Sequence, residues 1–270
     1  MQDFRTQDLQ QIFDQAEPEH QPMLSMLKSS PQDCWMLKVE GQPAGAIWVS
    51  APYEGVSQFW MYLLPEHRGK KLAQKLWAQV QEQAKTKESH ALEAYRPSEK
   101  WLAEKALALG FQEAGAYHLL SWPAPPQKAL PEGFEIQSYA EVQKDDLLLK
   151  MLETAYAGQH GHQIPTPETV ELLLESVSPE HIFLLKHQEE CIGITRLEMW
   201  EGTHVLDAPG LVPAFRTPEL ALALVSQVSQ NLQGFQMSSW GESPALLQAY
   251  LDAGATVVER TPFLVKALEP

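Results

Sequence analysis

An internal repeat is the feature that most restricts the fold. Identical residues recur 148 positions apart, and one offset shared by such dissimilar residue types is hard to obtain by chance. The pairs are Lys38/Lys186, Gly45/Gly193, Pro65/Pro213, Arg68/Arg216 and Ala73/Ala221. The length of 270 residues agrees, because single domains cluster at about 100–150 residues. The chain is therefore interpreted as two copies of one domain.

A proline-rich segment separates the copies. Residues 123–133 contain four prolines and no hydrophobic periodicity. Proline has no backbone N–H and a fixed φ, so this segment cannot continue a helix or a central strand. We predict an N-terminal domain over residues 1–122, a linker over 123–133 and a C-terminal domain over 134–270.

Hydrophobic spacing predicts the same order of elements in both copies. In the first copy we expect strands at 35–40, 44–50, 57–64, 92–95 and 117–122, with helices at 69–85 and 98–109. In the second we expect strands at 182–186, 191–199, 205–212, 235–239 and 257–265, with helices at 218–232 and 244–253. Each copy is predicted to be one mixed sheet flanked by helices, an α/β (α+β) domain.

Charge and composition exclude several classes of protein. The net charge of −15 argues against a nucleic-acid partner, because phosphate backbones are bound by clustered Lys and Arg. No apolar run reaches the roughly 20 residues that cross a bilayer, and the N-terminus lacks a signal-peptide pattern, so we expect a cytoplasmic protein without a membrane partner. Only two cysteines occur, Cys34 and Cys191, one in each copy, and we expect them to be reduced.

The repeated Pro-x-x-Arg segment carries the most chemistry. In the first copy a strand runs into Pro65–Ala73 and turns at once into a helix. Backbone N–H groups at a helix start lack intrahelical partners, and together with the helix dipole they favour phosphate or pyrophosphate. We expect Gly69 to permit the turn geometry, and Arg68, Lys70 and Lys71 to add positive charge. The alternative is an ordinary strand-to-helix turn with a solvated basic face.

This order of elements, with Gly110-Phe111 after the last helix, resembles the GNAT superfamily of acyl-CoA-dependent N-acetyltransferases. The family pattern is Arg or Gln, two residues, Gly, one residue, then Gly or Ala. Arg68 and Ala73 match it, whereas Lys71 replaces the middle glycine; the second copy has Arg216, Ala221 and Glu219 there. The resemblance implies two tandem GNAT-like domains with mixed, mostly antiparallel sheets, a layout similar to mycothiol synthase.

The resemblance also implies that acetyl-CoA is the co-substrate, with its pyrophosphate on the turn and its pantetheine between two splayed strands. No metal is implied, and the acceptor would be a small-molecule amine. In the first copy the cofactor-binding residues would be Leu63, Leu64, Arg68, Gly69, Lys70, Lys71, Leu72 and Ala73. Tyr62, Glu54 and Glu93 lie on or beside the strands expected to splay and are candidate acids or bases, although each could be an ordinary strand residue.

The two copies differ in what each retains. Many relatives have a Tyr proton donor four residues before the glycine that ends the last helix; this position is Tyr250 in the second copy and Ala106 in the first. In the second copy Thr217-Pro218-Glu219 caps the helix and places a carboxylate where a pyrophosphate would lie. We therefore place acetyl-CoA in the first copy. Tyr250 is interpreted either as the catalytic acid or as a core aromatic.

Two further interpretations stay open. Either the chain is a non-catalytic CoA- or ligand-binding pseudo-acetyltransferase, or catalysis occurs in the second copy. His160 and His162 form a weak metal pattern, better interpreted as a polar loop near the acceptor. The protein is expected to be a monomer or a homodimer.

Overall fold

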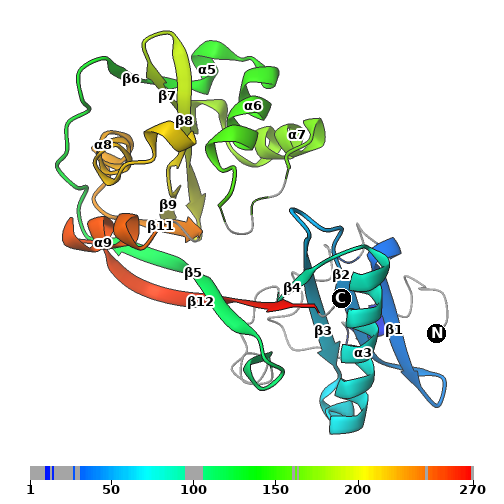
Figure 1. Ribbon diagram of the computed structural model, residues 1–270. Coiled ribbons are helices and arrows are strands. Elements are labelled where there is room, and N and C mark those ends of the chain that lie inside the picture. Colours follow the sequence, from blue (N-terminus) through cyan, green and yellow to red (C-terminus); the bar gives the residue numbers. More distant parts are fainter. Residues whose placement is uncertain are drawn as a thin grey trace. The chain divides into compact units, whose positions relative to one another are not determined.

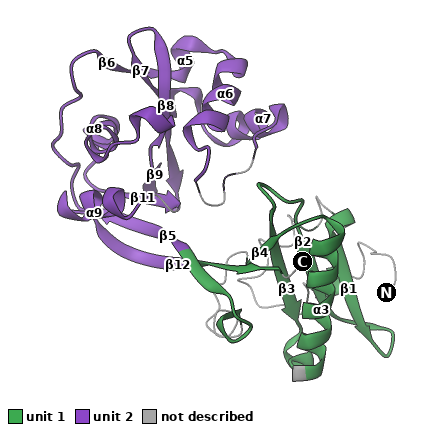
Figure 2. Ribbon diagram, viewed as in Figure 1, with its two compact units in different colours: residues 1–114, 262–270 green, residues 115–261 purple. Residues whose placement is uncertain are grey.

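The computed structural model describes residues 10–12, 14, 27, 31–94, 106–159, 162, 164–240 and 243–268 (Figure 1). The chain divides into two compact units (Figure 2). Unit 1 consists of Met1–Ala114 with Pro262–Pro270, and unit 2 of Gly115–Thr261. Within the described ranges, no helix combines the length and the apolar character needed to cross a bilayer.

Unit 1 is a sheet with one long helix against it (Figure 1). Its elements are β1 (Cys34–Val39), β2 (Gln42–Val49), β3 (Val56–Leu63), a 3-10 turn η3 (Pro65–His67), α3 (Lys70–Thr86), β4 (Ala91–Ala94) and the end of β12 (Thr256–Ala267). β1, β2 and β3 pair antiparallel, β3 pairs parallel with β4, and β4 pairs antiparallel with β12. A short 3-10 turn η2 (Pro31–Asp33) precedes β1.

Local sequence explains why this sheet forms. Glu40 and Gly41 both have positive φ, 51° and 82°, as a two-residue hairpin turn between β1 and β2 requires. Gly45 is needed for close approach of strands, because a Cβ there would lie 2.5 Å from the carbonyl oxygen of Tyr62. Its repeat partner Gly193 has the same role, since a Cβ there would lie 2.6 Å from a methyl of Leu211. The repeated glycine therefore reflects a repeated steric requirement.

The two faces of the unit 1 sheet have separate cores. One face packs on α3 through residues that include Ile47, Phe59, Leu76 and Val80. The other face carries aromatic side chains, and the buried residues on it include Trp48, Trp60, Tyr62, Ile12 and Leu27. Because side chains alternate along a strand, β3 presents Phe59 to one core and Trp60 to the other.

Unit 2 repeats this arrangement with additional elements before its first hairpin. These are β6 (Phe134–Ser138), α5 (Tyr139–Val142), α6 (Asp145–Ala155), α7 (Pro167–Ser176) and a 3-10 turn η4 (Pro179–His181). Then follow β7 (Ile182–His187), β8 (Glu190–Trp200), β9 (Thr203–Asp207), β10 (Gly210–Leu211), a 3-10 turn η5 (Pro213–Phe215), α8 (Pro218–Ser229), β11 (Phe235–Trp240) and α9 (Pro244–Asp252). With β5 (Gln112–Trp122) included, the strand order is β5-β11-β9-β8-β7-β6, and β10 pairs with β8. The strand expected at 205–212 is broken into β9 and β10.

Each copy gives its last strand to the other unit. β5 is the last strand of the first copy, and its residues Tyr117–Trp122 pair antiparallel with β11 in unit 2. β12 is the last strand of the second copy, and its end, Leu264–Ala267, pairs with β4 in unit 1. The compact units therefore differ from a division at the linker, because the edges of the two sheets, and not sequence proximity, select these strands.

The end of the chain is firmly bound in unit 1. Leu264 is buried in the core that faces α3, and the Leu268 N–H donates to the His90 carbonyl at 2.8 Å. Lys266 Nζ donates to the carbonyl of Leu109 and lies 5.6 Å from the centre of the Trp77 ring. A cation is favourable beside the carbonyl groups at a helix C-terminus, and it is also favourable over the face of an aromatic ring.

The proline-rich linker has fixed contacts with α8. Ser226 Oγ donates to the Pro126 carbonyl at 2.6 Å and accepts from the Lys128 N–H at 3.0 Å. Ser226 is itself buried. A single serine thus satisfies two backbone groups of a segment that, being rich in proline, cannot pair in a sheet.

Candidate functional site

The turn after β3 presents free backbone donors. Gly69 is the N-cap of α3, with φ −110° and ψ 148°, and no side chain caps the helix. The Leu72 and Ala73 N–H groups both donate to the Gly69 carbonyl at 3.1 Å. The amides of Lys70 and Lys71 donate to no acceptor in the part of the chain that the structure describes. Two outward N–H groups at the positive end of a 17-residue helix suit an anion.

Gly69 has a different role from the one predicted. Its φ of −110° is accessible to any residue, so the turn does not depend on glycine's conformational freedom. A Cβ at Gly69 would have only the His67 carbonyl oxygen within 4 Å, at 3.9 Å, so the position is open. The glycine matters because it leaves no side chain over the amides. Of Lys70, only the backbone belongs to the described structure; Lys71 is exposed.

The same turn in unit 2 has one donor fewer and carries a capping side chain. Thr217 has nearly the same backbone as Gly69, with φ −115° and ψ 146°. Its Oγ1 accepts from the Leu220 N–H at 3.3 Å, and Pro218 at the first helical position has no N–H. Glu219 adds a negative charge to the first turn. The two copies therefore share a backbone but differ in anion-binding capacity.

The repeated arginine closes the turn in both units. Arg68 Nε donates to the Leu63 carbonyl at 3.2 Å, and Arg216 Nε donates to the Leu211 carbonyl at 2.7 Å. Both bonds reach back five residues to the end of the preceding strand. Arg68 also lies 5.6 Å from the centre of the Tyr62 ring. Since the bond occurs in the capped unit 2 turn as well, it serves the fold of the turn in either unit.

We expect Arg68→Gln and Arg216→Gln each to lower the free energy of unfolding by about 1–2 kcal/mol, because each removes a charge-assisted hydrogen bond to a backbone carbonyl. Urea unfolding followed by hydrogen exchange in each unit measures this. Lys71→Gln, at an exposed position in the same turn, is the control and should change stability by under about 0.5 kcal/mol. An unchanged free energy of unfolding in both arginine variants would contradict a turn-closing role.

The point where β3 and β4 stop pairing is a second feature of unit 1. The parallel ladder ends at Phe59 and Ala94, and the pair before it is Gln58 and Glu93. Gln58 Nε2 donates to Glu93 Oε1 at 3.2 Å. Glu93 is only 5% exposed, although carboxylates are seldom buried without a specific partner. The last pair but one of the ladder thus holds a buried carboxylate.

Tyr62 lies farther along β3, on the face that also carries Gln58 and Trp60. Its ring stacks on Trp60, with centroids 5.8 Å apart and planes inclined by 3°. Leu63 and Leu64 are buried at the strand end beside the turn. Unit 1 therefore contains Tyr62, Glu93 and the whole predicted set from Leu63 to Ala73.

Tyr250 lies in unit 2. It is on α9, has no exposed surface and packs edge-on against Trp122, with ring centroids 6.2 Å apart. It belongs to the main hydrophobic core of that unit. Its repeat counterpart Ala106 is buried in the core of unit 1.

The other candidates do not belong to the β3–β4 ladder. Glu54 is exposed in a tight turn, with φ 48°. The ring of His162 lies 6.2 Å from that of Tyr156 in unit 2, and His160 lies outside the described residues. Among the side chains that the structure describes, no group of three or more His, Cys, Asp or Glu could hold a metal ion.

The last pair of the β9–β11 ladder in unit 2, which corresponds to Phe59 and Ala94, holds a neutralised carboxylate. Asp207 and Ser238 are paired across β9 and β11, and Ser238 Oγ donates to Asp207 Oδ1 at 2.7 Å. Arg196 Nε contacts Asp207 Oδ2 at 2.5 Å and Glu198 Oε1 at 3.1 Å. Burial disfavours the charged guanidinium, but the two carboxylates outweigh it and raise the pKa of Arg196.

The two cysteines form no disulfide. Cys34 is buried, and its Sγ donates to the Leu27 carbonyl at 3.6 Å. Burial, aided by the charge of Asp33, raises the pKa of Cys34 to about 12, so its thiolate is scarce at neutral pH.

Comparison with known proteins supports this description. Residues 2–111 match the acetyltransferase (GNAT) family model. A search of the curated proteins finds no match. A GCN5-related N-acetyltransferase from Sphaerobacter thermophilus shares 18% identity with a TM-score of 0.64, covering 96% of this chain and 90% of its own.

Other solved structures extend the likeness to tandem proteins. A tandem GNAT protein from the clavulanic acid biosynthesis pathway is 13% identical with a TM-score of 0.55, covering 88% of this chain and 83% of its own. A GCN5-related N-acetyltransferase from Anabaena variabilis is 12% identical and has a TM-score of 0.66. The match covers 98% of this chain and 69% of the Anabaena protein. Residues 2–111 thus match the GNAT acetyltransferase family, and the whole chain has the fold of a tandem GNAT protein.

Proposed function

We propose that this protein transfers the acetyl group of acetyl-CoA to a small-molecule amine, with acetyl-CoA bound by unit 1. The observation that carries the proposal is the difference between two otherwise equal turns. In unit 1 the amides of Lys70 and Lys71 have no acceptor within the described chain. In unit 2 Pro218 removes the first of these donors, the Thr217 side chain caps the helix, and Glu219 places a carboxylate in the first turn. A pyrophosphate fits the first turn and is disfavoured at the second.

Glu93 is proposed as the general base. The amine lone pair attacks the thioester carbonyl carbon, a C–N bond forms, the C–S bond breaks, and the amine gives one proton to the Glu93 carboxylate. The sulfur leaves as a thiolate, takes up a proton and departs as the CoA thiol. Tyr62 is the proposed donor of that proton, because it follows Gln58 on the same face of β3. One amide and one thiol are produced per turnover.

Glu93→Gln is expected to lower kcat by about 10²–10⁴, the usual loss when a positioned base is removed, while the Kd for acetyl-CoA changes by less than about threefold. Thiol release with a panel of amines gives kcat, and calorimetry gives Kd. Glu82→Gln, an exposed substitution on α3, is the matched control and should leave both unchanged. Unaltered kcat in Glu93→Gln would remove Glu93 from the mechanism.

Two outcomes favour the alternatives. Binding of acetyl-CoA without thiol release by any amine would favour a non-catalytic ligand-binding protein. Turnover that disappears in Tyr250→Phe, with stability and acetyl-CoA affinity retained, would move catalysis to unit 2. The burial of Tyr250 in the core supports the expectation that this variant keeps its activity.

A further inference from the structure

A groove lies between α3 and β1 in unit 1. It has a volume of about 400 Å³, and its walls are mostly apolar. The side chains that line it include Trp35, Leu37, Lys38, Ile47, Lys75 and Gln79. All the lining residues lie outside the turn from Pro65 to Ala73, which is the proposed binding site of the pyrophosphate. The groove is therefore a separate feature of unit 1.

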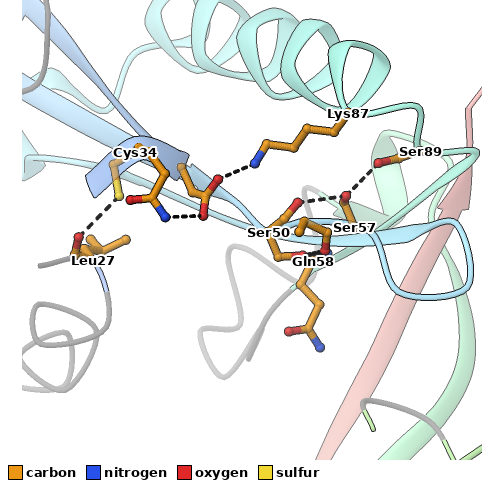
Figure 3. Close-up of polar contacts among 10 residues, drawn as sticks. Leu27, Cys34, Ser50, Ser57, Gln58, Lys87 and Ser89 are labelled. Carbon is orange, nitrogen blue, oxygen red and sulfur yellow. Dashed lines mark hydrogen bonds and ion pairs between the residues drawn. The ribbon is translucent and has the colours of Figure 1, made fainter. Parts of the chain in front are cut away.

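The two walls of the groove are tied together at one end. Lys87, at the C-terminus of α3, donates through Nζ to Asp33, which immediately precedes β1. Figure 3 shows the Lys87 side chain reaching from α3 toward the strand that begins at Cys34. Both side chains of this ion pair are largely shielded from water, so salt screens the attraction only weakly. The spacing between α3 and β1 is thus fixed by the fold.

The second copy provides a direct comparison, because α8 and β7 correspond to α3 and β1. β1 and β7 have a register shift at the same place, between Leu37 and Lys38 in one strand and 148 positions later in the other. Gln79 of α3 corresponds to Gln227 of α8 at the same offset. Leu185, the counterpart of Leu37, has no exposed surface, whereas Leu37 is partly exposed. The counterpart of the groove is therefore covered in unit 2.

The proline-rich linker contributes to this cover. Gln227 Nε2 donates to the Lys128 carbonyl at 3.4 Å, and the Lys128 N–H donates to Ser226 Oγ at 3.0 Å. The Leu130 side chain packs against the core that contains Leu185. Figure 1 shows this segment running past α8 to β6. The linker occurs once in the chain and is bound in unit 2, so a proline-containing peptide lies there at the position that is open in unit 1.

The groove of unit 1 carries more positive charge than its counterpart. Lys75 is exposed and stands where α8 has Ala223. Lys38 corresponds to Lys186, whose Nζ lies 3.0 Å from Oε1 of Glu135, a residue that follows the linker. The first lysine is thus an addition, and the counterpart of the second already pairs with a carboxylate of the covering segment. The charge of the groove suits an acidic peptide.

We propose that the groove between α3 and β1 binds an extended, acidic, proline-containing segment of a partner protein. The linker on unit 2 supplies the binding mode: Gln79 donates to a backbone carbonyl, an apolar side chain covers Leu37, and a carboxylate faces Lys75. Trp35 adds an aromatic wall of the kind against which extended proline-containing peptides pack. This interaction goes beyond acetyl transfer and does not depend on it.

The test uses a fluorescent peptide of residues 124–135 in which Lys128→Glu leaves three carboxylates and no cation. Anisotropy titration against the whole protein gives the Kd of the peptide. Gln79→Ala should raise this Kd about fivefold through loss of one hydrogen bond, and Lys75→Glu at least about tenfold through charge reversal. Gln227→Ala makes the same change in unit 2 and is the matched control, which should alter Kd by less than about twofold.

Hydrogen exchange locates the bound peptide, and amides of β1 and α3 should gain protection. A Kd above about 1 mM, or a Kd that Gln79→Ala and Lys75→Glu leave unchanged, overturns the inference. Binding that responds to Gln227→Ala instead means that the peptide replaces the linker on unit 2, which also overturns it. Octanoate is tested in parallel: protection of the same amides by octanoate but not by the peptide identifies a site for small amphipathic anions and excludes a peptide site. Thiol release is measured separately, so failure here leaves the acetyltransferase proposal intact.

Discussion

Truncation after Thr261 is expected to abolish cooperative folding of unit 1 while unit 2 stays folded. The deletion removes Phe263 and Leu264, both buried, together with the strand that pairs with β4. Burial of two such side chains contributes about 3–6 kcal/mol, a large share of the 5–15 kcal/mol that typically separates folded from unfolded domains. Exposure of the β4 edge adds unpaired backbone groups and a tendency to aggregate.

Hydrogen exchange resolved by residue measures the two units separately. Amides in β1–β3 should lose protection in the truncated chain, and those in β7 and β8 should keep it. A synthetic peptide of residues 256–270 should restore protection in unit 1, and a peptide with Leu264→Asp should not. Native protection of unit 1 in the truncated chain would show that β12 is dispensable there.

Transfer of the unit 2 cap into unit 1 is expected to weaken acetyl-CoA binding by at least about 100-fold. In Gly69→Thr with Lys70→Pro, the threonine hydroxyl accepts a hydrogen bond from an N–H of the first turn, as Thr217 does in unit 2. The proline has no N–H to offer, as is the case for Pro218. The loss of one charge-assisted hydrogen bond, together with a side chain where glycine leaves the turn open, accounts for the size of the effect. The helix itself should become more stable, because it gains a cap.

This combination of weaker binding and unchanged or higher stability excludes unfolding as the cause. Calorimetry measures Kd, and thermal unfolding measures stability. The matched control makes the reverse change in unit 2, Thr217→Gly with Pro218→Lys, which should leave affinity for acetyl-CoA as it was. Full affinity in the capped variant of unit 1 would place the pyrophosphate elsewhere.

Much of the fold follows from local patterns. The helix expected at 69–85 is observed as α3 at Lys70–Thr86, because Leu72, Leu76 and Val80 keep helical spacing and face the sheet. The cap predicted at Thr217-Pro218 is present. These features depend on residues within a few positions of one another, and short-range spacing reports them well.

Features set by distant residues were not predicted. The exchange of β5 and β12 depends on which sheet edges are open, and a strand's own sequence does not encode its partner. The break between β9 and β10 reflects the ring of Tyr156, which lies so close to Gly210 that a Cβ there would meet it at 2.6 Å. The hydrogen bond from Gln58 to Glu93 joins residues that are 35 positions apart and lie on different strands. Helices α5, α6 and α7 were also not predicted.

The exchange of β5 and β12 between the two copies also limits how the gene can evolve. A duplicated copy that has lost its chemistry is ordinarily free to disappear. Here the second copy has a capped helix and an ion-paired carboxylate, yet it carries the strand that completes its neighbour's sheet. Point substitutions in the turn of unit 2 leave that strand in place, whereas a stop codon before Pro262 removes it and leaves the sheet of unit 1 incomplete. The two copies are therefore inherited together, because the last strand of the second copy completes the sheet of unit 1.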